Sequence, residues 1–305
     1  MLQIFSRSKD LNDPVLGSPR LNRVGLHQTR VRLAAVCAKR RRTRLGKPYD
    51  HLQARLDRDG VLMIESFLPD EAYQAVSAEA EQAQKQASAN NPPTPGQGKW
   101  FGSKQRHPWG FDRYDGGTLN RFVNIDPERH PNADQFRGGQ SIAQLASALV
   151  GGALNPAHAW FYLTKNGDQQ AFPDPQKGFH RDTFFSSLKY WYFLRPVDRE
   201  NGPFEYYRGS HRLTPERLAW EHDQALKAMA KPRGSRGSSF RISEEDTKAL
   251  GLNSPTSLTA PANTLVMADT FGFHRRGDAQ EGTERLAIYG NLRPWPLRFT
   301  QAQPR

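Results

Sequence analysis

The chain has 305 residues, of which 36% are hydrophobic and 24% are charged, and its formal net charge is +12. This length suits one enzyme-sized domain with extensions or two small domains, and the composition is that of a globular rather than a disordered protein. A single cysteine, Cys37, excludes a disulfide framework or a thiolate metal site within one chain, and without a signal peptide or a transmembrane run we expect a cytoplasmic protein.

The positive charge is concentrated at the N-terminus. Residues 1–50 contain 12 Lys or Arg and three Asp, whereas the remainder of the chain holds 31 basic and 28 acidic residues. Residues 22–45 have a helical pattern with a basic end. We therefore divide the chain into a basic arm over residues 1–48, partly helical or disordered, and a second domain over residues 49–305.

The basic arm has three interpretations. The first is a solvated charge run on a helix that packs against the rest of the protein. The second is contact between residues 22–47 and an anionic membrane surface, where each basic residue near an acidic leaflet contributes about 1 kcal/mol. The third is nucleic-acid binding, which we do not favour because no recognition motif is present. The sequence leaves peripheral contact with the inner membrane face open, and it does not predict an oligomeric state.

Short strands alternate with helices beyond the arm. Helices are predicted over residues 51–58, 69–85, 140–150 and 215–230, with another short helix from residue 243. Strands are predicted over residues 61–64, 122–125, 159–164, 189–194, 204–207, 264–267 and 285–292. Residues 99–121, rich in aromatic, glycine and basic residues, are predicted as a long irregular loop that either contributes to a substrate pocket or lid, or anchors itself in the core. This mixture favours a closed or sandwich-like β core with helices packed outside.

The triplet His180-Arg181-Asp182 is the strongest chemical signal in the chain. On an extended segment, residues two apart project from the same side, so an imidazole and a carboxylate are presented together. A second, distant histidine would complete a facial triad, a ligand set that suits non-haem Fe(II) and leaves three coordination positions open. His211 and His274 are the candidates for this third ligand.

Arg285 favours His274 over His211. It lies eleven residues after His274, in a segment that alternates like a strand, and it shares its parity with Ala287 and Tyr289. An arginine that points into a barrel needs an anionic partner, because burying an unpaired guanidinium is costly, and a dicarboxylate cosubstrate would provide one. No arginine follows His211 at a similar distance, so we interpret His211 as a loop residue that hydrogen-bonds to the backbone.

Together these segments resemble the phytanoyl-CoA dioxygenase family of Fe(II)/2-oxoglutarate oxygenases. The resemblance spans roughly residues 50–295 and is carried by residues 56–68, 179–182, 188–194, 200–204 and 209–212 and by His274 with Arg285. It implies a mainly β fold with flanking helices and a double-stranded β-helix (jelly-roll, cupin-like) core. It also implies that His180, Asp182 and His274 hold Fe(II), that Arg285 holds the far carboxylate of 2-oxoglutarate, and that O2 is consumed. Candidates for further contacts with 2-oxoglutarate are Tyr162, Thr164 and Lys189.

An oxygenase of this kind would hydroxylate an unactivated C–H bond and release succinate and CO2. Asp182 favours hydroxylation, because a halogenase of this type usually replaces that carboxylate with a small residue. The basic arm and residues 99–121 indicate an anionic small-molecule or lipid-linked substrate, such as a glycolipid. The alternatives are a metal-binding β-barrel enzyme that does not use 2-oxoglutarate and a non-catalytic binding protein that kept the fold.

Overall fold

The computed structural model describes residues 3–96 and 102–300. Its helices are α1 (Pro19–Arg23), α2 (Leu26–Arg41), α3 (Gln53–Asp59), α4 (Asp70–Ala89), α5 (Pro131–Arg137), α6 (Gln140–Val150), α7 (Pro215–Met229) and α8 (Glu244–Ala249), with short 3-10 turns at Gln3–Phe5, Asp50–Leu52, Pro156–His158 and Pro175–Lys177. Its strands are β1 (Val61–Ile64), β2 (Ser103–His107), β3 (Gly110–Asp115), β4 (Thr118–Asn124), β5 (Ala159–Lys165), β6 (Leu188–Phe193), β7 (Phe204–Tyr206), β8 (Thr256–Leu258), β9 (Thr264–Asp269), β10 (His274–Arg276) and β11 (Glu284–Leu292).

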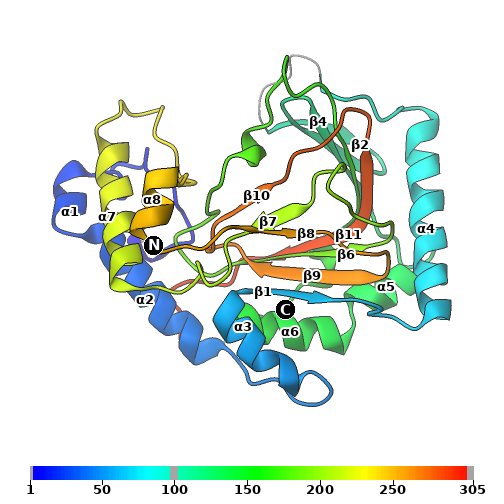
Figure 1. Cartoon of the computed structure of the whole chain (residues 1–305), viewed down its shortest axis with the longest axis horizontal. Helices are drawn as coiled ribbons and strands as arrows, with labels where there is room; N and C mark the ends of the chain where they lie inside the picture. Colours follow the sequence, from blue (N-terminus) through cyan, green and yellow to red (C-terminus); the bar gives the residue numbers. More distant parts are fainter. Residues whose placement is uncertain (1–2, 97–101, 301–305) are drawn as a thin grey trace.

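Within these residues the strands form two antiparallel sheets (Figure 1). The larger sheet has the order β1-β9-β6-β11-β5-β4-β3-β2, and the smaller sheet has the order β10-β7-β8. From β6 onward the chain crosses between the sheets: β6, β9 and β11 lie in the large sheet, and β7, β8 and β10 lie in the small one. This winding of one chain through two facing sheets is the double-stranded β-helix arrangement, so the predicted fold class is confirmed.

Alternation along the strands divides the interior into two layers. In β5, Phe161 and Leu163 pack with α3, α4 and α6 on the outer face of the large sheet, while Tyr162 points to the core between the sheets. In β6, Tyr192 faces the helices and Trp191 faces the small sheet. The strands β5, β6 and β9, which are covered on both faces, read as nearly continuous apolar runs, and the sequence pattern located them well.

Residues 103–124 correct the prediction of a long irregular loop. They form the meander β2-β3-β4, which extends the large sheet, and residues 99–101 lie outside the described part of the chain. The turn before β4 uses Gly116 at φ 62°, a conformation that side chains other than glycine rarely adopt. Asp112 lies opposite Arg121 in the register, and the buried pair has an N–O distance of 2.8 Å. These charges interrupt the apolar alternation that would have indicated the strands of the meander.

The N-terminal arm is packed on the rest of the protein. Helix α2 lies against α7 and runs along the lower left edge of the view in Figure 1. Arg30 is buried and donates hydrogen bonds to three main-chain carbonyls between residues 4 and 8. Arg41 is also buried and donates to the carbonyl of Gly151 at 2.9 Å. Part of the positive charge of the arm is therefore buried and bound to main-chain carbonyls. The division of the chain at residue 48 stays a prediction.

None of the helices within residues 3–96 and 102–300 combines the length and the apolar character that a membrane crossing requires.

Candidate metal centre and its surroundings

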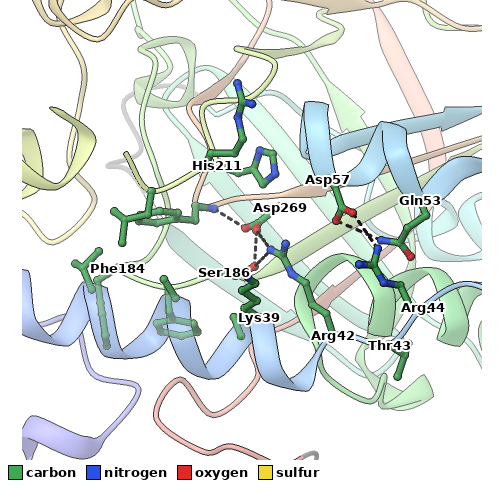
Figure 2. Close-up of a pocket in the computed structure, with 17 residues that line it drawn as sticks. Lys39, Arg42, Thr43, Arg44, Gln53, Asp57, Phe184, Ser186, His211 and Asp269 are labelled. Carbon is green, nitrogen blue, oxygen red and sulfur yellow. Dashed lines mark hydrogen bonds and ion pairs between the residues drawn. The ribbon is translucent and has the colours of Figure 1, made fainter. Parts of the chain in front are cut away.

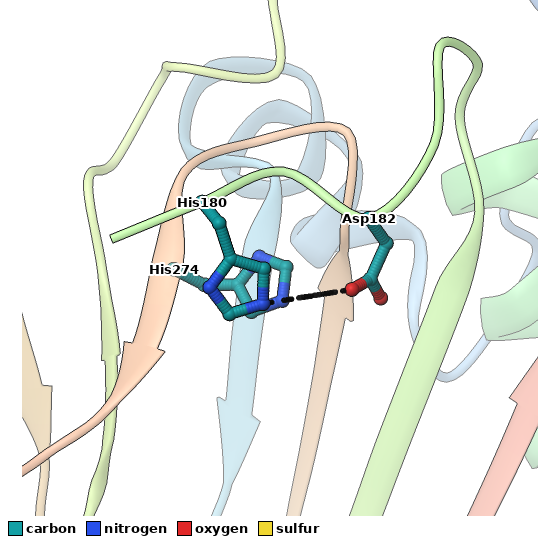
Figure 3. Close-up of side chains that lie close together, drawn as sticks. All are labelled: His180, Asp182 and His274. Atoms are coloured by element: carbon teal, nitrogen blue, oxygen red, sulfur yellow. Dashed lines mark ion pairs between the residues drawn. The ribbon is translucent and has the colours of Figure 1, made fainter. Parts of the chain in front are cut away.

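His180, Asp182 and His274 come together between the two sheets (Figure 3). The Nε2 atoms of His180 and His274 lie 3.7 Å and 3.6 Å from Oδ1 of Asp182, and the two ring centroids are 4.6 Å apart. All three side chains are buried. Among the described residues they are the group of His, Cys, Asp and Glu side chains whose ligand atoms are close enough to share one metal ion. His211 lies outside this group, as predicted.

Main-chain hydrogen bonds hold the two ligand-bearing segments side by side. The amide of His180 donates to the carbonyl of His274, and the amide of His274 donates back, both at 3.0 Å. The amide of Asp182 donates to the carbonyl of Thr270 at 2.9 Å. The segment before β6 therefore runs antiparallel to the start of β10, and segments far apart in the sequence present their ligands at a fixed separation.

The two imidazoles have the tautomer that a metal needs. Nδ1 of His180 lies 2.8 Å from the carbonyl of Gly178, and Nδ1 of His274 lies 2.9 Å from the carbonyl of Gly272. Because a carbonyl can only accept, each Nδ1 carries the proton and each Nε2 keeps a free lone pair. Nε2 of His274 is buried without a hydrogen-bond partner among the described residues. An orphaned buried acceptor costs free energy, and a metal ion at this point would remove that cost.

The electrostatics favour a neutral imidazole at His180 and an ionised carboxylate at Asp182. Burial, reinforced by the neighbouring His274, lowers the pKa of His180 to about 3. Burial alone would raise the pKa of Asp182, but Lys189 and the two histidines hold that pKa well below its usual range. Two neutral nitrogen donors and one carboxylate oxygen are the donor set of a 2-His-1-carboxylate iron site. The residues present therefore fit Fe(II).

Two lysines contact Asp182 from outside the triad. Nζ of Lys189 lies 2.7 Å from Oδ2 of Asp182, so Oδ1 is the oxygen left facing the histidines. Lys9 donates to the main-chain carbonyl of Asp182 and, at 2.6 Å, to the hydroxyl of Ser239. Burial lowers the pKa of Lys9 to about 8, against the opposing effect of Asp182. The N-terminal arm thus reaches the metal-bearing segment, a contact that the sequence did not indicate.

Arg285 points into the cavity beside the triad. This cavity is also lined by Tyr162, Lys189, Trp191 and His274. The Arg285 side chain is buried, its Nε has no hydrogen-bond partner, and no carboxylate pairs with it among the described residues. Burial, together with the nearby Arg276, lowers the pKa of Arg285 to about 10. A buried guanidinium without a counter-ion is the feature expected of a site that receives an anion.

The other three arginines that line this cavity, Arg113, Arg275 and Arg276, are already paired with acids, and Arg275 lies 2.6 Å from Glu205. Arg276 pairs with Asp174 and lies 3.6 Å from Asp115, while Arg113 lies 2.9 Å from Asp115. Four guanidiniums, including that of Arg285, therefore share three carboxylates, and one positive charge remains. The sequence carried no signal for this network, because its members come from separate strands and loops.

The three further residues named as candidate contacts for a cosubstrate take different positions. Thr164 lies opposite Arg285 in the β5–β11 register, and its buried hydroxyl has no hydrogen-bond partner among the described residues. The hydroxyl of Tyr162 donates to the side chain of Asn120 at 2.5 Å. Lys189 pairs with Asp182. Thr164 is therefore the candidate with a free hydrogen-bonding group next to the unpaired arginine.

A buried charge cluster supports the metal-bearing segment from behind. Arg181, between the two ligands His180 and Asp182, forms a two-pronged contact with Glu221 of α7, at 2.9 and 2.8 Å. Arg217 of α7 and His27 of α2 contact the same carboxylate at 3.2 and 2.9 Å. Glu221 is fully buried. This carboxylate therefore links both helices to the metal-bearing segment.

Comparisons with solved structures return distant relatives of the fold. The epimerase SnoN, in complex with Fe3+, alpha ketoglutarate and nogalamycin RO, is 14% identical with a TM-score of 0.47, over 79% of this chain and 82% of that chain. HygX from Streptomyces hygroscopicus, with nickel and 2-oxoglutarate bound, is 12% identical with a TM-score of 0.45, over 81% and 86%. EctD from S. alaskensis with bound Fe is 12% identical with a TM-score of 0.44, over 84% of each chain. No match was found among curated protein sequences.

The comparison with protein families is more specific. The family model described as phytanoyl-CoA dioxygenase matches residues 56–248, which is more than half of the chain. The matched range contains His180 and Asp182 and ends before His274 and Arg285, so the family match does not extend to the last two. The chain belongs to the phytanoyl-CoA dioxygenase family and is an Fe(II)/2-oxoglutarate-dependent oxygenase.

Proposed function

We propose that the protein hydroxylates an unactivated C–H bond of a small-molecule or lipid-linked substrate, with His180, Asp182 and His274 as the iron ligands. The observation that carries this proposal is the convergence of two unprotonated Nε2 atoms and one carboxylate oxygen in a buried site. When bound, Fe(II) supplies the oxidising chemistry, in which O2 and 2-oxoglutarate are consumed, succinate and CO2 are released and C–H becomes C–OH. The retained carboxylate of Asp182 favours hydroxylation over halogenation.

The residues around the triad have separate tasks in this proposal. Lys189 holds one oxygen of Asp182 and so orients the other toward the metal. Arg285 would bind the far carboxylate of 2-oxoglutarate, with the hydroxyl of Thr164 as a neighbouring donor. The aromatic walls exclude water from the reacting atoms.

Coupled assays test the proposal against its alternatives. Purified protein supplied with Fe(II) and 2-oxoglutarate should consume O2 and form succinate. A metal-binding enzyme that does not use 2-oxoglutarate would show activity without succinate, and a non-catalytic binding protein would show neither. Either of these results would contradict the proposal.

Arg285→Ala is expected to raise the Michaelis constant for 2-oxoglutarate by roughly 10- to 100-fold, because a charge-assisted hydrogen bond contributes about 1.5–3 kcal/mol. Arg285→Lys keeps the charge but loses the planar fork, so an intermediate value is expected. Steady-state succinate formation over a 2-oxoglutarate titration measures both. An unchanged constant in the alanine variant would remove Arg285 from the cosubstrate site.

The chemistry of a second cavity supports an anionic substrate. This cavity, of about 220 Å³, lies beside Asp182, and four cationic side chains line it: Lys104, Arg113, Lys189 and Arg293. Among the described residues, Asp182 is the acidic side chain that lines it. Half of its remaining lining residues are aromatic: Phe111, Phe122, Trp160 and Tyr289. Lys104 and Arg293 have no ion-pair partner among the described residues, so their charges are available. We infer a substrate with an apolar or aromatic body and an anionic group.

The double variant Lys104→Gln/Arg293→Gln should weaken binding of phenyl phosphate by at least roughly tenfold, because each lost charge-assisted contact costs more than about 1 kcal/mol. Binding of benzyl alcohol, which has the ring without the charge, should not respond. Calorimetry on protein loaded with Ni(II) and 2-oxoglutarate measures both ligands. Arg199→Gln/Lys248→Gln removes the same charge at exposed positions elsewhere. Equal weakening in this control, or no affinity for phenyl phosphate, would contradict the inferred substrate class.

A further inference from the structure

The exposed apolar side chains of this protein are concentrated in one part of the chain. Among the described residues, the large hydrophobic side chains with high exposure are Phe5, Leu21, Val24, Leu33, Val36 and Phe299, from 39% to 82% exposed. Five of the six belong to the N-terminal arm and the sixth to the C-terminal segment. Single exposed apolar residues are ordinary, but their collection in a segment that also carries most of the net charge indicates an interaction surface.

Helix α2 presents a continuous outward stripe, which we define as Arg32, Leu33, Val36, Lys39 and Arg40. These residues are all exposed, and their spacing of three and four places them on one side of the helix. The opposite side of α2 is occupied: Val31 and Ala34 pack with Phe184 and Phe271, and Arg30 and Arg41 bind main-chain carbonyls. The helix is therefore anchored on its inner side, and no helix or strand of the described residues covers the outward α2 stripe.

The cationic side chains of the outward α2 stripe have no acidic partner among the described residues. Helix α2 contains no Asp or Glu. Neither Arg32 nor Lys39 has an ion-pair partner among the described residues, and Arg40 lies over the ring of Phe299 at 5.0 Å from its centroid. That contact adds an exposed aromatic residue beside the stripe. Cationic side chains thus flank two apolar side chains on one surface, so the same surface offers contacts to lipid phosphates and to the acyl boundary of an anionic membrane.

The cavity on the inner side of α2 is a weaker candidate for a ligand site (Figure 2). It has a volume of about 570 Å³ and a basic rim, but two of the rim arginines already have partners. Arg42 lies 3.3 Å from the buried carboxylate of Asp269, and Arg44 lies 3.3 Å from Asp57. Lys39 lines the cavity and also belongs to the outward α2 stripe. Arg32 and Arg40 do not line the cavity, so these two cations of the stripe face outward only.

We propose that the outward α2 stripe docks the enzyme on an anionic membrane surface. Leu33 and Val36 would enter the boundary between head groups and acyl chains, while Arg32, Lys39 and Arg40 would contact lipid phosphates. The charge complementarity favours an acidic leaflet over a neutral one. The apolar residues between the cations favour a membrane over a nucleic acid, whose backbone offers no apolar contact of this kind.

Vesicle sedimentation of the full-length protein tests this proposal. The protein should bind vesicles of phosphatidylcholine mixed with phosphatidylglycerol, and should bind vesicles of phosphatidylcholine alone much more weakly. The variant Arg32→Gln/Lys39→Gln/Arg40→Gln should lose roughly 100-fold in affinity for the acidic vesicles. Leu33→Ser/Val36→Ser should also bind more weakly, and its remaining binding should be more sensitive to salt. The matched control Lys85→Gln/Arg199→Gln/Lys248→Gln removes the same charge at exposed positions outside the arm and should bind like the parent protein.

Three outcomes would overturn the proposal: no binding of the parent protein to acidic vesicles, equal loss in the stripe variant and the matched control, or retained binding in both stripe variants. A change of molecular mass in the stripe variants, seen by light scattering, would assign the surface to contact between copies of the chain instead. The thermal unfolding of each variant verifies that it is folded. Succinate formation is measured separately, without vesicles. A failed membrane assay therefore leaves the proposed oxygenase function intact, and a failed succinate assay leaves the membrane result intact.

Discussion

Asp182→Ala is expected to abolish the conversion of 2-oxoglutarate to succinate, and His180→Ala should do the same. Asp182 lies within 3.7 Å of both Nε2 atoms, and it is the carboxylate of the triad. Loss of a group that only orients a metal ligand costs 10- to 100-fold in metal affinity or activity, so loss of a ligand should cost more than about 100-fold. The measurement is succinate formation at saturating Fe(II) and 2-oxoglutarate, together with Fe(II) binding by calorimetry.

His211→Gln provides the matched control for this expectation. His211 is also buried and was the competing candidate for the third ligand, but it lies against Gly60 and lines the cavity beside α2 instead of the metal site. Its replacement should leave Fe(II) binding and succinate formation close to those of the parent protein. Normal succinate formation in His180→Ala or Asp182→Ala would falsify the assignment of the iron site.

Glu221→Gln should reduce the free energy of unfolding by about 3–5 kcal/mol, because breaking a buried charge cluster leaves uncompensated cations in the interior. Glu221 accepts hydrogen bonds from Arg181 and Arg217 and contacts His27, all of them buried. Denaturant unfolding, followed by circular dichroism, measures the change. Asp223→Asn on the same helix removes an exposed pair with Lys227 and should cost less than about 1 kcal/mol. Similar values for both variants would contradict the structural role of the cluster.

The same cluster predicts a pH dependence. Burial alone would raise the pKa of Glu221, but Arg181, His27 and Arg217 lower it below its ordinary value. A carboxylate whose folded pKa is depressed contributes stability that is complete above its unfolded pKa of about 4.3 and is lost as the pH falls. The stability difference between the parent protein and Glu221→Gln should therefore shrink on acidification below about pH 4.3.

Local pattern was sufficient to predict the candidate metal ligands and most of the strands. The spacing of His180 and Asp182 determines that both side chains leave one side of an extended segment, whatever lies opposite. The parity of Arg285 with Ala287 and Tyr289 correctly placed it toward the interior between the sheets, where Ala287 is buried. Strand β1 and helix α6 were predicted with the bounds that the structure has, because their apolar runs end at glycine or polar residues.

The tertiary structure decided which residues far apart in the sequence pair with one another. Of the meander over residues 103–124 only the strand at its end was predicted, because Asp112 and Arg121 neutralise each other only when β3 and β4 are in register. The link from His27 and Arg181 to Glu221 likewise depends on the packing of α2 and α7. A residue pattern reports which side of an element is buried, and it carries no information about which other element covers that side. The sequence by itself therefore predicted the candidate ligands and the side from which they project. The unpaired charge of Arg285 and the outer side of α2, which no described element covers, became evident only from the folded chain.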